Sequence, residues 1–179
     1  MQRTVQTIVQ HIRTVQDALN TISDELRRRA FAHDSSKFQS DEFEGYTRFE
    51  LMPKGLEYGS KEYQDAMKVI MTDNDCFTLH AQRNDHHPEH FSDVQKMNFI
   101  QIQEMVCDWA GDHMRNSNTG AWTESVLFNM RKHNFSEGQQ WLIRQVAEHL
   151  KMHILVLQEN DTPWPKNSVV TGESNETPE

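Results

Sequence analysis

The chain has 179 residues, of which 36% are hydrophobic, and a formal net charge of −9. This length suffices for one domain with a buried core, and the low content of 7 glycines and 5 prolines disfavours a turn-rich β-sandwich. The negative charge argues against a nucleic-acid polymer as partner, because phosphate backbones require a basic surface, whereas a small phosphorylated ligand is compatible with it if bound cations reverse the local field.

The N-terminal region carries the clearest helical pattern. Seven apolar residues, spaced alternately by three and four positions, form a stripe: Val5, Ile8, Ile12, Val15, Leu19, Ile22 and Leu26. This spacing predicts a long helix with one apolar face, and a coiled coil is the alternative reading of the same repeat. His11 lies at the edge of the stripe, so we expect it to be half-buried and directed at whatever the helix packs against.

The middle of the chain is expected to alternate helices and loops. After a break near residues 35–43, a short helix is predicted over 41–50, followed by a loop over 51–60. A second long helix should begin after Ser60, include Phe77 and reach about His80 before Pro88 ends the helical pattern. The next helix is expected to open with Ser92 as N-cap, with Gln95 at capping-box spacing, and to run to about Asp112.

The C-terminal third repeats these signals. Residues 121–133 are predicted to be helical, and Ser136 with Gln139 forms a second capping box before a last helix that ends near Leu157. The polar residues from 158 on have no period. The sequence therefore predicts a single all-α domain over 1–157 and a disordered tail over 158–179.

The cellular location follows from what the sequence does not contain. Cys76 and Cys107 form no CxxC pair, and the N-terminal residues include no continuous apolar stretch typical of a secretory signal. No run of residues approaches the roughly 20 apolar positions of a membrane span. We expect reduced thiols, a cytoplasmic protein and no membrane partner.

Histidine is the unusual component of the composition. Ten are present, and four fall within eleven positions, at His80, His86, His87 and His90. Imidazole is the commonest protein ligand for metals, and carboxylates complete such sites in hydrolases. Residues of both types follow one another on separate predicted elements, which a helical bundle could bring to one point: His11, His33, Asp34, His80, His86, His87 and Asp108.

This order of residues resembles that of the HD superfamily of metal-dependent phosphohydrolases, which is named for adjacent His and Asp ligands. The resemblance implies a helical bundle with a metal site in its core. It implies one ion held by four residues: His11, His33, Asp34 and Asp108. It implies that a second ion would be held by the middle histidines: His80, His86 and His87.

Two further strings extend the resemblance. HDSSK at 33–37 is similar to the HDxxK string of cyclic-dinucleotide phosphodiesterases and of myo-inositol oxygenase, which implies that Lys37 faces the substrate. The set HIRTV, HDSSKF, NDHHPEH and EMVCDW resembles small, uncharacterised HD-like proteins of phages and bacteria. The chain departs from the phosphodiesterases in lacking the glycine of HDxGK and a following GYP triplet. His80 and His86 are also closer together than the middle ligands of these relatives.

The resemblance implies a metal-dependent phosphohydrolase that acts on a nucleotide or similar small phosphate ester through metal-activated water. Asp34 would bridge two metals, Lys37 would stabilise the phosphoryl charge, and Glu104 would orient water or protonate a leaving group. One or two divalent ions are expected, from Mn, Mg, Co, Ni, Zn and Fe. A di-iron oxygenase and a catalytically silent nucleotide-binding protein are the alternatives. A homo-oligomer formed through the first or last helix also stays open.

Overall fold

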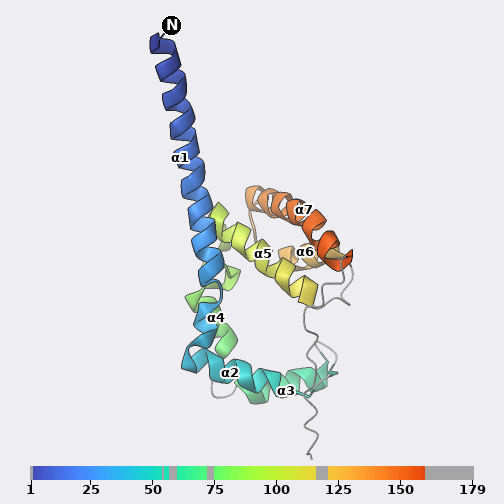
Figure 1. The fold of residues 1–179 in the computed structure, drawn as a ribbon. Helices are drawn as coiled ribbons and strands as arrows, with labels where there is room; N and C mark the ends of the chain where they lie inside the picture. The colour runs from blue at the N-terminus through green and yellow to red at the C-terminus, as the bar shows by residue number, and fades with distance from the viewer. Residues whose placement is uncertain (1, 54, 57–59, 72–74, 116–120, 160–179) are drawn as a thin grey trace, which may run out of the picture.

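The computed structural model describes residues 2–53, 55–56, 60–71, 75–115 and 121–159. Within these ranges the chain folds into seven α-helices and three short 3-10 helices, without a strand (Figure 1). The prediction of an all-α fold is confirmed. None of the helices in the described ranges is long and apolar enough to cross a membrane.

The first helix, α1 (Gln2–Ala32), is continuous over 31 residues, and its N-terminal part projects away from the other helices (Figure 1). The predicted apolar stripe is helical, as expected, but no residue of α1 is buried. His11 is exposed to solvent, so the expectation that it would be half-buried is wrong. Among the described elements, the stripe has no neighbour to pack against until the C-terminal end of the helix, where α1 contacts α5.

The segment after α1 forms a second group of helices. The 3-10 helix η1 (Ser35–Phe38) leads into α2 (Ser40–Glu50), which packs against α3 (Lys61–Met71) and α4 (Cys76–Arg83). The single helix predicted from residue 61 to His80 is therefore two helices. Asp75 is the N-cap of the second helix, α4, because its side chain accepts a hydrogen bond from the backbone N–H of Thr78 at 3.0 Å.

Two 3-10 helices, η2 (Pro88–His90) and η3 (Val94–Lys96), connect α4 to α5 (Phe99–Arg115). The predicted start of this helix at Ser92 is wrong, because Asn98 caps it instead. Oδ1 of Asn98 accepts from the N–H groups of Ile100 and Gln101 at 3.0 and 3.1 Å, and Oε1 of Gln101 accepts from the N–H of Asn98 at 2.8 Å. This reciprocal pattern is a capping box built from Asn and Gln.

The last two helices, α6 (Trp122–Arg131) and α7 (Glu137–Glu159), pack on α5 and enclose the main hydrophobic core. The second predicted capping box is present: the N–H of Gln139 donates to Oγ of Ser136 at 3.3 Å, and the N–H of Ser136 donates to Oε1 of Gln139 at 3.0 Å. Twelve buried residues form the core: Met97, Ile102, Met105, Val106, Ala110, Trp122, Val126, Met130, Phe135, Ile143, Ala147 and Ile154. The predicted tail lies outside the described residues from position 160 on.

Candidate metal centre

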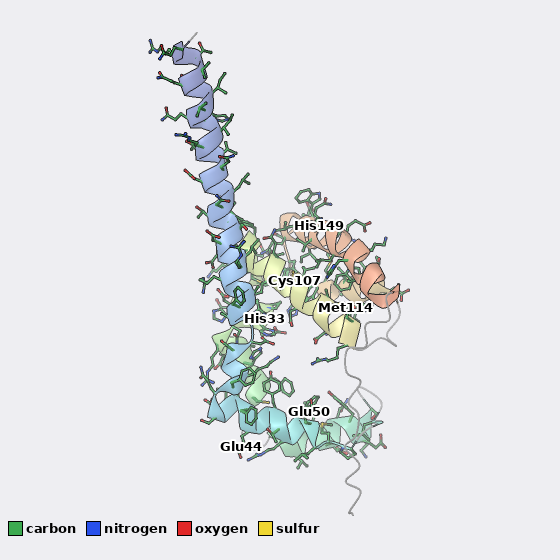
Figure 2. All side chains as sticks on the ribbon, in the orientation of Figure 1. His33, Glu44, Glu50, Cys107, Met114 and His149 are labelled. Carbon is green, nitrogen blue, oxygen red and sulfur yellow. The ribbon has the colours of Figure 1, made fainter. Side chains whose placement is uncertain are left out.

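A sharp turn at the end of α1 positions His33 beside α5 (Figure 2), and Asp34 directly follows it in the turn. Asp34 has φ 56° and ψ 12°, and it is the one residue other than glycine with positive φ among those described. Asp and Asn adopt this left-handed conformation more readily than other residues with a side chain. The turn ends the helix and starts η1, with the N–H of Lys37 donating to the carbonyl oxygen of Asp34 at 2.9 Å.

Four side chains from three segments converge at this turn: Asp34, His80, His86 and His87. One nitrogen or oxygen of each lies within 4.8 Å of the others. Nε2 of His80 is 3.0 Å and Nε2 of His86 is 3.5 Å from Oδ1 of Asp34. The structure thus brings together one carboxylate and three imidazoles, a donor set that suits a transition-metal ion.

The inward-facing atoms of these four residues have an unusual environment. Oδ1 of Asp34 and the three Nε2 atoms are all buried, and within the described part of the chain none has a partner at hydrogen-bonding angles. Buried polar atoms in proteins are nearly always satisfied, so four orphans that face one another require an explanation. A bound cation would satisfy all four together, whereas a hydrophobic neighbour would satisfy none.

A second group shares Asp34 with the first. Nε2 of His33 lies 3.6 Å from Oδ2 of Asp34 and 3.5 Å from Oδ1 of Asp108, and these three residues also have ligand atoms within 4.8 Å of one another. The two oxygens of Asp34 therefore face different groups, Oδ1 toward His80 and His86 and Oδ2 toward His33. This is the arrangement required of a carboxylate that bridges two ions.

Glu42, on α2, fixes the orientation of one of the imidazoles. Its side chain is fully buried, and Oε2 lies 2.9 Å from Nδ1 of His80 and 2.9 Å from Oγ of Ser36. Nη1 of Arg83 donates to Oε1 at 2.9 Å. A carboxylate that accepts from Nδ1 holds Nε2 of the same ring toward the centre, which is how outer residues commonly support metal ligands.

Glu104, on α5, plays the same part for two other rings. Its Oε1 lies 2.9 Å from Nδ1 of His33 and 3.3 Å from Nδ1 of His86, while Oε2 accepts a hydrogen bond from Arg29. Both oxygens are thus engaged behind the ligand rings. This geometry favours a role for Glu104 in orienting the ligand rings over the predicted roles of orienting water or protonating a leaving group.

Arg29 is held in the same layer by charge pairing. Its guanidinium also bonds Asp85, and Nε2 of Gln101 donates to Oδ2 of Asp85 at 2.7 Å. The Arg29 side chain is 13% exposed. It therefore ties the end of α1 to α5 and to the segment before His86, and its charge is neutralised by the two carboxylates.

Lys37 is the cation at the rim. Its Nζ donates to Oδ2 of Asp34 at 2.5 Å, lies 5.1 Å from the centre of the Tyr46 ring, and belongs to a side chain that is 36% exposed. The ammonium is thus next to the shared carboxylate and also open to solvent. This position leaves the ammonium accessible from solvent at the edge of the cluster.

The charges of the cluster follow from burial and pairing. Burial raises the pKa of Asp34, but the combined opposing effect of the neighbouring His80, His86 and Lys37 is larger. The pKa of Asp34 therefore lies below its usual range. Burial together with the adjacent His86 and His80 lowers the pKa of His87 to about 4. His87 is consequently neutral at pH 7 and ready to act as a ligand.

His33 behaves in the opposite way. Asp108 and Glu104 stabilise its charged form and raise the pKa of His33 to about 10, against a smaller opposing effect of burial. In the metal-free protein at neutral pH, His33 therefore carries a proton. Binding a metal ion at the second group requires release of that proton.

The structure does not bring His11 to the cluster. His11 and His33 are separated by 22 positions along α1 and its last turn, which corresponds to about 33 Å at a rise of 1.5 Å per residue. His11 is exposed on the projecting part of the helix. The prediction that it binds the same ion as Asp34 of its own chain is wrong, because both residues belong to one continuous helix and its terminal turn.

Residues 1–154 match the model of a protein family described as "Family of unknown function (DUF5662)", and the chain belongs to this family. The matched range includes the whole cluster and the projecting part of α1. No curated protein and no solved structure matches the chain.

Proposed function

We propose that the chain is a metal-dependent phosphohydrolase that acts on a nucleotide or a similar small phosphate ester. The observation that carries the proposal is the set of four buried, mutually facing ligand atoms of Asp34, His80, His86 and His87, none of which has a hydrogen-bond partner among the described residues. The adjacent His33 and Asp34 also agree with the resemblance to HD-type phosphohydrolases. A divalent cation at such a site supplies Lewis acidity and lowers the pKa of a bound water.

The donor set restricts which cation fits. Three imidazole nitrogens and one carboxylate oxygen suit Mn²⁺, Fe²⁺, Co²⁺, Ni²⁺ or Zn²⁺ better than Mg²⁺, which prefers oxygen ligands. Two of the imidazoles have their outer nitrogens next to carboxylates, Glu42 for His80 and Glu104 for His86. The site is therefore preorganised for a transition metal, and its assembly needs no large rearrangement.

The residues that would contact the substrate are the cations at the edge of the cluster, Lys37 and His33. Lys37 presents an ammonium beside Asp34, where it stabilises negative charge on phosphoryl oxygens. While no ion occupies the second group, His33 is protonated between Asp34 and Asp108, which adds a second positive charge at the same side of the cluster. Together these two residues attract a phosphate group to the edge of a cluster that is otherwise rich in carboxylates.

The test is a reconstitution of the purified full-length protein with Mn²⁺, Mg²⁺, Co²⁺, Ni²⁺, Fe²⁺ or Zn²⁺, followed by a screen of nucleotides and phosphate esters for phosphate release. We expect hydrolysis with at least one transition metal, loss of hydrolysis in Asp34→Asn and a large loss in Lys37→Met. His11→Ala is the matched control and should retain activity. Retention of full activity by Asp34→Asn would contradict the proposal.

A di-iron oxygenase is the second candidate, favoured by the position of Asp34 between two ligand groups that share it. Such a bridging carboxylate suits a pair of iron ions. Aerobic purification, iron analysis and optical spectroscopy distinguish the two functions. Two irons per chain with characteristic absorption bands and no phosphate release would favour the oxygenase.

A further inference from the structure

The projecting part of α1 exposes an apolar face that nothing in the described structure covers. Every residue from 2 to 24 is exposed, and Figure 1 shows this segment extending beyond the other helices. The side of the helix that carries the stripe exposes six large aliphatic residues to between 40% and 62%: Val5, Ile8, Ile12, Val15, Leu19 and Ile22. An exposed apolar band of this length on a soluble domain indicates an interaction surface.

The period of the stripe identifies the kind of partner. The alternation of three and four positions gives a mean period of 3.5, which places Val5, Ile12 and Leu19 at a positions and Ile8, Val15 and Ile22 at d positions of a heptad. A straight α-helix drifts by about 20° per heptad relative to this repeat. A strict 3.5 period over three heptads therefore fits another helix that supercoils around α1 better than it fits a flat surface.

The charges on α1 favour a second copy of the same chain. The charged residues between positions 2 and 24 all occupy b or f positions, on the outer side of the helix: Arg3, Arg13, Asp17 and Asp24. The flanking e and g positions of the same stretch carry no Asp, Glu, Lys or Arg: Gln2, Thr4, Val9, His11, Gln16, Ala18 and Ser23. Charges at e and g set partner choice, and like charges that face one another there oppose the pairing of identical helices. Because residues 2–24 carry no such charges, nothing at these positions opposes a second copy of the same helix.

The end of the stripe is compatible with this arrangement. Glu25, at the next g position, is already paired with Arg28 of its own helix, with Nε of Arg28 donating at 2.8 Å. Leu26 is partly buried near the body of the protein. Two copies of α1 can therefore pair along residues 5–26, about 33 Å of helix, without like charges meeting at the seam.

We propose that the chain self-associates by packing α1 of one copy along α1 of a second copy as a coiled coil. This inference is independent of the proposed catalytic function, since it rests on residues that lie outside the metal cluster. It assigns to residues 5–26 a role that neither the hydrophobic core nor the cluster requires.

The test is the molar mass of the full-length protein by size-exclusion chromatography with light scattering over a range of concentrations. The wild-type protein should elute with a mass of at least twice the 21.0 kDa of one chain. The double variant Ile12→Glu/Leu19→Glu should be monomeric, because it places two carboxylates in the seam of each copy. The matched control, Gln10→Glu/Thr21→Glu, adds the same charge at f and c positions and should keep the wild-type mass.

A milder variant distinguishes loss of pairing from unfolding of α1. Leu19→Gln introduces no charge, and it should raise the concentration at which the oligomer dissociates by at least tenfold, with an unchanged circular dichroism spectrum. A wild-type protein that is monomeric at every concentration would overturn the proposal. So would a seam variant with the wild-type mass, or a control variant that dissociates as readily as the seam variant.

Discussion

One histidine on the projecting part of α1 and another directly after its last residue have different surroundings. His11 and the apolar residues around it are exposed on a part of the helix that contacts no other described element, whereas His33 meets Glu104 and Asp108 of α5 at 2.9 and 3.5 Å. The difference shows that a histidine becomes a plausible ligand through what faces it. The order of candidate ligands along the chain does not show which of them meet in space. Two histidines on one long helix stay apart, because each residue between them adds 1.5 Å along the axis.

The largest expected effect is at the shared carboxylate. Asp34→Asn removes the charge that both ligand groups use but keeps a residue that tolerates φ 56°. We expect metal affinity to fall by more than about 100-fold with the helices intact. Isothermal titration with Mn²⁺ or Co²⁺ and far-UV circular dichroism measure the two quantities, and an affinity within threefold of the wild type would refute the assignment.

A smaller loss is expected when an orienting carboxylate is changed. Glu42→Gln weakens the hold on Nδ1 of His80 and should reduce metal affinity by about 10- to 100-fold. Asp41→Asn is the matched control, because Asp41 pairs with the same Arg83 at the surface and does not touch an imidazole ligand. Equal losses in both variants would mean that Arg83, and not the contact to His80, accounts for the effect.

The charge of His33 gives a pH dependence of stability in the metal-free protein. Its pKa is about 10 in the folded state, above the value near 6.5 expected when unfolded, so its contribution is complete below pH 6.5 and is lost as pH rises toward 10. His33→Gln should remove roughly 1–2 kcal/mol at pH 6, a discounted figure because His33 is partly exposed.

Denaturant unfolding of the metal-free wild type and His33→Gln at pH 6, 8 and 10 measures this contribution. The difference in the free energy of unfolding should shrink steadily as pH increases. A difference that grows with pH would show that the protonated form of His33 is not the one that the carboxylates stabilise.

The smallest effect is expected for a change at His11, where the structure and the sequence-based hypothesis make opposite predictions. His11→Ala should leave metal affinity and activity unchanged, since His11 lies about 33 Å along the helix from His33. The sequence alone predicts loss of a ligand from the same substitution. Metal titration of this variant beside Asp34→Asn therefore compares the two ends of α1 directly, and a tenfold loss in His11→Ala would favour the sequence-based hypothesis.

Local patterns in the sequence were sufficient for much of the fold. Apolar periodicity predicted the first helix, and the pairing of Ser136 with Gln139 predicted the start of the last one. The helix predicted from residue 61 to His80 is interrupted because Asp75 caps a new helix. The helix α5 starts at Phe99 because Asn98 and Gln101 form its capping box, whereas Asp93 caps the short helix η3 before it. These errors come from competition between nearby capping signals, which apolar periodicity does not resolve.

The site was less predictable than the fold for a different reason. The residue types were informative, since His33, Asp34, His80, His86, His87 and Asp108 all reach the cluster. The histidine that each supporting carboxylate contacts was not predictable, because Glu42 contacts His80 across 38 positions and Glu104 contacts His33 across 71. Such pairings depend on how α2, α4 and α5 pack against one another, and the residue spacing within a single helix does not predict that packing.

The most direct test of the central claim is anomalous X-ray diffraction from crystals of the protein loaded with Mn²⁺, Co²⁺ or Zn²⁺. We expect an anomalous peak about 2.0–2.3 Å from Oδ1 of Asp34 and from Nε2 of at least two of His80, His86 and His87. A second, weaker peak between His33, Oδ2 of Asp34 and Asp108 would identify the two-ion form. Metal-loaded crystals with no peak at Asp34, or with the ion bound elsewhere, would contradict it.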